Sequence, residues 1–170
     1  MSKRDLKKYL SELNKEQLEL QLMELYEKFA NIKVYYDFVF RPNEINLIKE
    51  AKLKISNEYF PIRGKKPKMR RSVAQKFIKH YIILGVDSFI IADIMLYNLE
   101  IAQSLSSKKV INQEQFFKSM LTSFKQTLNF MIEKGILPEF QDRVVAIKNN
   151  SINQNWINKY EFNAILERFE

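Results

Sequence analysis

The residues best suited to chemistry are cations, gathered in one short run of the chain. Eight lysines and arginines occur between residues 63 and 79, and no Asp or Glu occurs between Glu58 and Asp87. They are Arg63, Lys65, Lys66, Lys68, Arg70, Arg71, Lys76 and Lys79. Without these eight, the chain's 28 basic residues become 20, which equals its number of acidic residues. The whole net charge of +8 therefore lies in this run, residues 63–79, which we call the basic segment.

Anion binding is the chemistry that such a run can perform. Three of the chain's seven arginines, Arg63, Arg70 and Arg71, lie in it, and the arginine fork holds phosphate or carboxylate through two parallel hydrogen bonds. The eight cations are therefore the candidate anion-binding residues, with nucleic acid or another polyanion as the expected partner. If about six of them met phosphates, affinity would fall with salt at a log-log slope on the order of five. Base-specific recognition is not expected, because no helix-turn-helix spacing or aromatic-basic interleaving occurs.

A structural interpretation competes with this one. Glu58, Asp93 and Glu100 are placed to neutralise some of the cations inside the fold, which would leave a lysine-rich loop that serves solubility. Under that interpretation Asp93 and Glu100 pair with Arg70, Arg71 or a lysine. The two interpretations make opposite predictions about what surrounds Arg70 and Arg71.

The same two carboxylates are the nearest approach to a catalytic pair. Asp93 and Glu100 lie seven residues apart, about 10 Å along a helix, and such a separation is not diagnostic of a glycosidase. His80 has no acidic residue or serine at triad spacing and is expected to be exposed. No catalytic residue is predicted, and an enzyme that used Asp93 or Glu100 with a hard metal is the weakest alternative.

Composition narrows the remaining chemistry. The chain has no cysteine and one histidine, which excludes disulfides and thiolate zinc sites and gives no reason to expect a metal or cofactor. Gly64, Lys65 and Lys66 lack the first glycine and the Ser or Thr of a phosphate-binding P-loop. The opening MSKRDLKKYL lacks the apolar run of a signal peptide, and no stretch is long enough to span a bilayer. We therefore expect a cytoplasmic protein with no membrane partner.

The elements that position these residues are predicted to be helices. Apolar residues recur at helical spacing in eight segments, over about 2–13, 15 to the low thirties, 42–58, 68–85, 88–106, 112–134, 138–152 and 158–169. The run VYYDFVF, residues 34–40, has strand propensity, but the helical period continues through it and predicts a helix that restarts near Asn31. Trp156, before the last helix, is expected to anchor packing.

The basic segment should form a loop followed by a helix. Pro61, Gly64 and Pro67 cannot lie within a helix, so the helix is predicted to begin at Lys68 or Met69 and to end at Gly85. Its predicted buried face is Val73, Ala74, Phe77, Tyr81 and Leu84, with Arg71, Gln75, Lys76 and Lys79 on the opposite side. Cations at a helix start cost about 0.3 to 1 kcal/mol each, and a bound anion would offset that cost.

The predicted fold is all-α. Apolar residues cover most of the circumference of the helix at 88–106, which should therefore be central. We expect residues 1–170 to form a single helical domain, a compact array of seven or eight mostly antiparallel helices, with pairwise stacking like an α-solenoid as its variant.

Three segments resemble a known family. SKRDLKKYLSELNKEQLELQLMELYEKF, EYFPIRGKKPKMRRSVAQKFIKHY and GVDSFIIADIMLYNLEIAQS are similar to a family of small, uncharacterised bacterial helical proteins known only as a domain of unknown function. The resemblance implies a helical cytoplasmic protein and supplies no reaction or catalytic residue.

Two functions from different classes follow. The first is a binding or adaptor protein whose basic segment holds an anionic partner. The second is a protein-interaction scaffold in which the basic loop is incidental, and it predicts an exposed apolar patch and binding that is insensitive to salt.

Overall fold

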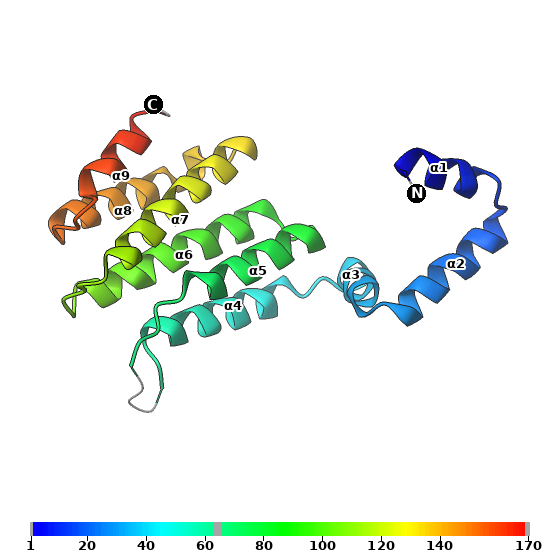
Figure 1. Cartoon of the computed structure of the whole chain (residues 1–170), viewed down its shortest axis with the longest axis horizontal. Coiled ribbons are helices and arrows are strands. Elements are labelled where there is room, and N and C mark those ends of the chain that lie inside the picture. The colour runs from blue at the N-terminus through cyan, green and yellow to red at the C-terminus, as the bar shows by residue number, and fades with distance from the viewer. Residues whose placement is uncertain (1, 63–65, 169–170) are drawn as a thin grey trace. The chain divides into compact units, whose positions relative to one another are not determined.

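The computed structural model describes residues 2–62 and 66–168. Within them the chain forms nine α-helices and one 3-10 helix and no β-strand (Figure 1). The all-α prediction is confirmed, with slightly more helices than the seven or eight expected. Contacts between Cα atoms divide the chain into two units, Met1–Asn43 and Glu44–Glu170. That residues 1–170 behave as one domain stays a prediction.

The first unit consists of α1 (Lys3–Ser11), α2 (Lys15–Lys28) and α3 (Ala30–Phe40). The first two helices begin at reciprocal capping boxes, in which each side chain accepts from the other residue's backbone N–H. Ser2 pairs with Asp5 in this way, and Asn14 with Gln17. Phe29 has extended dihedral angles, φ −118° and ψ 110°, and separates α2 from α3. Residues 34–40 are helical, as the period predicted.

The second unit has six helices. They are α4 (Glu44–Tyr59), α5 (Arg71–Leu84), α6 (Ser88–Ser106), α7 (Glu114–Glu133), α8 (Gln141–Asn153) and α9 (Lys159–Leu166), with the 3-10 turn at Pro138–Phe140 before α8. Asp87 caps α6 by accepting from the N–H of Phe89 at 2.8 Å. Gly85 and Gly135 follow α5 and α7 with φ of 75° and 68°, the left-handed conformation that glycine adopts without steric cost.

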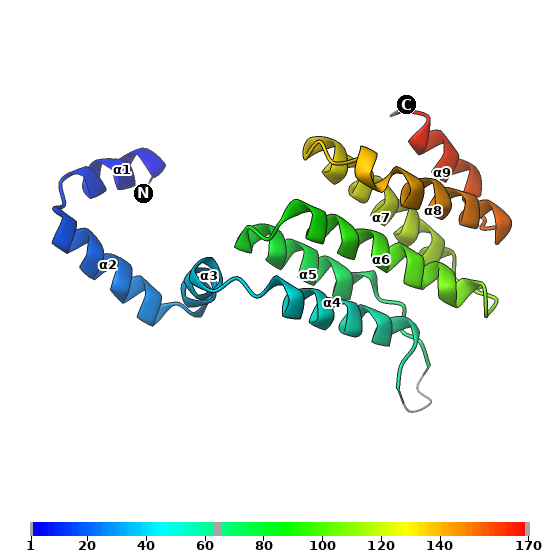
Figure 2. The same cartoon turned by 180° about the vertical axis from the view of Figure 1, so that it is seen from behind.

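These six helices pack around α6. In Figures 1 and 2 they follow one another across the unit in chain order, and α9 contacts α7 and α8. The helix α6 contacts α4, α5, α7 and α8 and buries more side chains than any other described helix. Its predicted central place is confirmed, and pairwise stacking like an α-solenoid stays a prediction.

The core of the second unit is largely apolar. Tyr59 lies fully buried and donates to Asn98 Oδ1 at 3.2 Å. Trp156 is 2% exposed, and its ring centroid lies 5.4 to 5.6 Å from those of Phe116, Phe117 and Phe162. Edge-to-face ring packing of this kind confirms Trp156 as a packing anchor.

Several helices begin two or three residues later than predicted, and α5 and α7 show why. The fourth predicted helix, α5, begins at Arg71 and not at Lys68, because Met69 has φ 52° and a left-handed residue cannot continue a right-handed helix. The helix predicted over 112–134 begins at Glu114 in α7, and its N-cap, Gln113, makes no side-chain hydrogen bond.

Candidate functional site

Glu58, at the end of α4, fastens the basic segment to the fold. Its carboxylate accepts two hydrogen bonds from the guanidinium of Arg70, at 2.8 and 2.7 Å. Its backbone carbonyl accepts from the N–H groups of Lys68 and Met69, at 3.0 and 3.1 Å. The hydrogen bonds from Arg70 hold the pKa of Glu58 below its usual range, against the opposing effect of burial. The expectation that Glu58 neutralises one of the cations is therefore confirmed.

Arg71 is also held within the fold. Its Nε donates to Ser123 Oγ of α7 at 2.8 Å, and its Nη2 donates to Gln126 Oε1. Its side chain is half-buried, and burial lowers its pKa. The sequence prediction placed Arg71 on the solvent side of α5, and this is wrong: Arg71 faces the neighbouring helix α7 and links the two helices.

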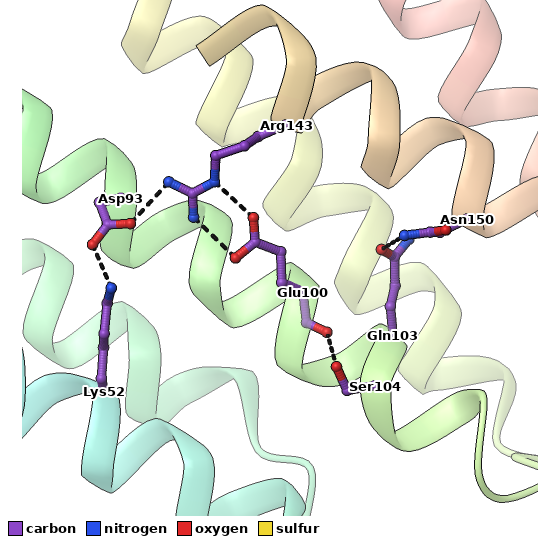
Figure 3. Close-up of polar contacts among 7 residues, drawn as sticks. All are labelled: Lys52, Asp93, Glu100, Gln103, Ser104, Arg143 and Asn150. Carbon is purple, nitrogen blue, oxygen red and sulfur yellow. Dashed lines mark hydrogen bonds and ion pairs between the residues drawn. The ribbon is translucent and has the colours of Figure 1, made fainter. Parts of the chain in front are cut away.

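The carboxylates of α6 are neutralised by partners other than Arg70 and Arg71 (Figure 3). The guanidinium of Arg143, on α8, donates to both oxygens of Glu100 at 2.7 and 2.9 Å and to Asp93 Oδ1 at 2.8 Å. Lys52 Nζ of α4 lies 2.6 Å from Asp93 Oδ2. Pairing with Arg70 or Arg71 was predicted wrongly, whereas the predicted lysine partner for Asp93 is correct. The network joins α4, α6 and α8.

The pKa of Arg143 reflects this network. Burial alone would lower it, but the hydrogen bonds and charges of Glu100 and Asp93 outweigh burial and raise it. Sequence reasoning missed Arg143, which lies 43 residues beyond Glu100. One feature of the sequence could have drawn attention to it: Arg143 is the only arginine between Arg71 and Arg168.

Four lysines of the basic segment remain open to solvent. Lys66, Lys68, Lys76 and Lys79 are exposed, and none of them forms an ion pair with a carboxylate in the described part of the chain. Arg63 and Lys65 lie outside the described residues. The eight candidate cations thus divide into two arginines used by the fold, four exposed lysines and two positions on which the structure gives no information.

Lys66 lies at a pocket that a second loop helps to build. The pocket has a volume of about 280 Å³, and Lys109, from the connection between α6 and α7, also lines it. The rest of its lining is Pro67, Met69, Leu105, Val110, Ile111, Asn112 and Gln113. Neighbouring Lys108 places its Nζ 5.4 Å from the centre of the Phe60 ring. The sequence prediction missed Lys108 and Lys109, although these two adjacent lysines closely follow the helix predicted over 88–106.

Lys76 lines a different hollow, against α4. Its volume is about 470 Å³, and Glu50, Lys54, Val73, Phe77 and His80 line it together with Lys76. Val73 and Phe77 were predicted on the buried face of α5 but are half-buried. Ile78, which was not predicted there, is buried. His80 is exposed, as expected. The hollow is therefore lined by the carboxylate of Glu50 as well as by the cations of Lys54 and Lys76.

The polar side chains of α6 and α8 link these two helices. In residues 2–62 and 66–168, no group of three or more His, Cys, Asp and Glu side chains is placed to hold a metal ion. A shallow pocket of about 260 Å³ lies beside Glu100 and is lined by Gln103, Ser104 and Asn150 among others. Gln103 donates to the carbonyl of Ile147 at 2.7 Å, which ties α6 to α8.

No described helix combines the length and the apolar character needed to cross a membrane. Comparison with curated proteins gave no match, and comparison with solved structures gave none either. A family model, the family of unknown function DUF6155, matches residues 1–170. The match covers all three segments that suggested a family of this kind, and the chain belongs to DUF6155.

Proposed function

We propose that this protein is a helical adaptor that binds a polyanion, with nucleic acid as the leading candidate, through exposed lysines of the basic segment. The observation that carries the proposal is the pocket shared by Lys66 and Lys109, which come from two separate connections of the second unit. Two cations beside one hollow raise the local potential more than two isolated surface lysines do. Lys68 lies next to this pocket in the chain and is also exposed.

The kind of contact with the polyanion depends on which cations of the basic segment the fold does not already use. Arg70 and Arg71 each donate two hydrogen bonds, to Glu58 in one case and to Ser123 and Gln126 in the other. The Arg70 side chain is 53% exposed but already paired, so the exposed cations without an ion pair among the described residues of the segment are the four lysines. Lysine acts as a compact charge without a fixed fork, which suits phosphate backbones more than base edges. If about four lysines met phosphates, the log-log salt slope of affinity would be on the order of three to four.

The test is fluorescence anisotropy with labelled single-stranded DNA, RNA and duplex DNA between about 50 and 200 mM salt. We expect the triple variant K66A/K68A/K109A to weaken binding at least about tenfold. It should also reduce the salt slope by about two to three, since each phosphate that a lysine no longer neutralises removes roughly 0.7 to 0.9 from the slope.

The matched control is K49A/K125A/K148A, which removes the same charge from other helices of the second unit. It should change affinity much less. Equal losses in the two triple variants would mean that net charge alone attracts the polyanion, and the proposed surface would then be rejected.

A second candidate function is a protein-interaction scaffold. The observation that favours it is the apolar surface of the first unit, where no side chain of α1, α2 or α3 is buried. Exposed apolar surface of this kind is typical of an interaction site. Binding through it should be insensitive to salt and unaffected by the lysine variants, which separates the two functions.

A further inference from the structure

The first unit presents apolar side chains for which it has no core. Thirteen large apolar residues between Leu6 and Phe40 are exposed, among them Leu20 at 70%, Met23 at 54% and Phe40 at 77%. A segment of about 40 residues normally needs a disulfide, a metal or a partner chain to stay folded. The chain has no cysteine for a disulfide, and a second apolar surface, from elsewhere in the chain or from a partner, would cover these side chains.

The helices that carry these side chains are nevertheless encoded locally. Both capping boxes are complete, with Ser2 and Asp5 bonded at 2.9 and 3.2 Å and Asn14 and Gln17 at 3.0 and 2.9 Å. Such caps fix where a helix starts without any tertiary contact. The apolar faces of α1 and α2 are therefore displayed on defined helices.

A groove lies between α2 and α3. It has a volume of about 420 Å³ and is lined by Leu22, Met23, Tyr26, Tyr36, Asp37 and Phe40. Asp37 is its one ionisable carboxylate, and Tyr26 donates to Asp37 Oδ1 at 2.8 Å. An apolar groove with an acidic edge fits an amphipathic helix that carries cations beside its apolar face.

The helix α1 has that chemistry. Four of its nine residues are basic and one is acidic, and Leu6, Tyr9 and Leu10 repeat at the spacing of one helical face. The helix α2 has the opposite balance, with four glutamates against two lysines. Figures 1 and 2 place α1 and α3 at opposite ends of α2, and no residue of α1 lines the groove.

We propose that the first unit is a self-association module, in which α1 of each copy occupies the α2–α3 groove of a second copy. The inference rests on the second candidate function and names its partner. Both halves of the contact, a basic apolar helix and an acidic apolar groove, lie on one chain, and a two-fold interface requires that self-complementarity. Two-fold symmetry doubles this contact, which favours an interface of the usual stable size, about 800 Å² on each partner.

Engineered thiols test the pairing cleanly, because the chain has no cysteine of its own. Leu10→Cys and Met23→Cys chains are mixed and oxidised. We expect a disulfide-linked dimer from the mixture and much less from either chain alone. Mixing Lys125→Cys, on α7, with Met23→Cys is the matched control and should give little product. If both thiols in one chain form only an intrachain bond at monomer size, the groove is covered within the chain and the proposal is overturned.

Complementation gives a second, independent test by light scattering. L6D/L10D removes the apolar face of α1, and M23D/F40D removes the groove. Each variant should be monomeric, and their mixture should recover a heterodimer, because one intact helix and one intact groove remain. Trp156, buried in the second unit, reports by its fluorescence that this unit stays folded. A wild-type chain that is monomeric at its highest soluble concentration overturns the proposal.

The same variants separate this proposal from the function on which it rests. A monomeric wild-type chain that binds an apolar dye, with binding lost in L6D/L10D, has an open interaction surface: the scaffold function stands and the self-pairing fails. A monomeric chain that binds no dye overturns both. Polyanion binding should be unchanged in L6D/L10D.

Discussion

At the scale of single residues, three arginines explain how the fold uses its charge. Arg70 and Arg71 follow one another in the chain, yet one is held by a carboxylate at the end of α4 and the other by neutral side chains of α7. Arg143 bonds two carboxylates of α6 at once, one of which, Asp93, also pairs with Lys52. Each guanidinium therefore links separate helices, and the four exposed lysines of the basic segment remain available for solvent or a ligand.

Replacing Arg143 by Met should destabilise the second unit. The substitution leaves Glu100 without its partner and Asp93 with Lys52 alone, and because these side chains are about one-third exposed, solvent screening limits the cost to about 1 to 2 kcal/mol. Urea unfolding followed by Trp156 fluorescence measures the difference. Lys125→Met is the control and should be nearly neutral. An unchanged midpoint for Arg143→Met would mean that the network contributes no net stability.

The pair between Glu58 and Arg70 should make stability depend on pH. Hydrogen bonds from Arg70 lower the folded-state pKa of Glu58 from its ordinary value of 4.5. A lowered carboxyl pKa stabilises the folded state above the unfolded-state value, and this contribution disappears as the pH falls through the folded-state value. Glu58→Gln should therefore lower the urea midpoint at neutral pH and have little effect at pH well below 4.5. An equal deficit at both pH values would refute the assignment.

The residues that sequence could not supply are those whose partners are remote. The sequence predicted that Glu58, Asp93 and Glu100 would neutralise cations of the basic segment, because these carboxylates flank or follow it. Only Glu58 does so, whereas Asp93 and Glu100 pair with Lys52 and Arg143. The sequence did not identify Arg143, because no local period relates α8 to α6. It placed Arg71 on the solvent side of α5, because a helical wheel uses only the residues of one helix. The neighbouring helix α7, which contacts Arg71, does not enter that calculation.

At the scale of elements, local signals predicted the helices well. Asp87 before α6 and the glycines after α5 and α7 define ends that depend on only a few residues, so they were predicted closely. The start of α5 was placed too early, because the signal for it was the absence of proline after Pro67. The actual start is set by the left-handed Met69, whose N–H bonds back to Glu58, and that is a tertiary cause.

Gly85→Ala tests the ending of α5. An added Cβ at Gly85 meets no atom within 4 Å, so the cost is that of the left-handed backbone alone, about 1 kcal/mol. Thermal unfolding by circular dichroism checks this value. Gly135→Ala, with nothing within 4 Å and a similar φ of 68°, should give the same loss after α7. A much larger loss at either site would show that the chain shifts to avoid the strain.

At the scale of the whole molecule, burial is confined to one part of the chain. Every buried side chain in the described residues lies between Ala51 and Leu166, so the second unit contains the core. A fragment of residues 43–170 should fold cooperatively, and its urea m-value should be close to that of the full chain, because the m-value follows the surface exposed on unfolding. A fragment without a cooperative transition would show that the first unit completes the core.

Sequence predicted this molecule as all-α with α6 at its centre, because a helix that is apolar all round has to be enclosed. It did not predict that residues 2–42 would bury nothing. Their periodic leucines are the same signal that a core helix gives, and periodicity alone does not say which surface covers an apolar face.

The double hold of Glu58 on the start of α5 bears on how this family can vary. Its carbonyl and carboxylate together hold Lys68, Met69 and Arg70, so the chain between α4 and α5 is closed at its base by a single residue. Insertions or deletions between Pro61 and Pro67 should therefore leave the packing of α4 against α5 unchanged. The hydrogen bonds of Glu58 fix the two ends of the connection, whatever its length. Relatives could vary the length and charge of this connection, and with them the ligand, on one unchanged scaffold.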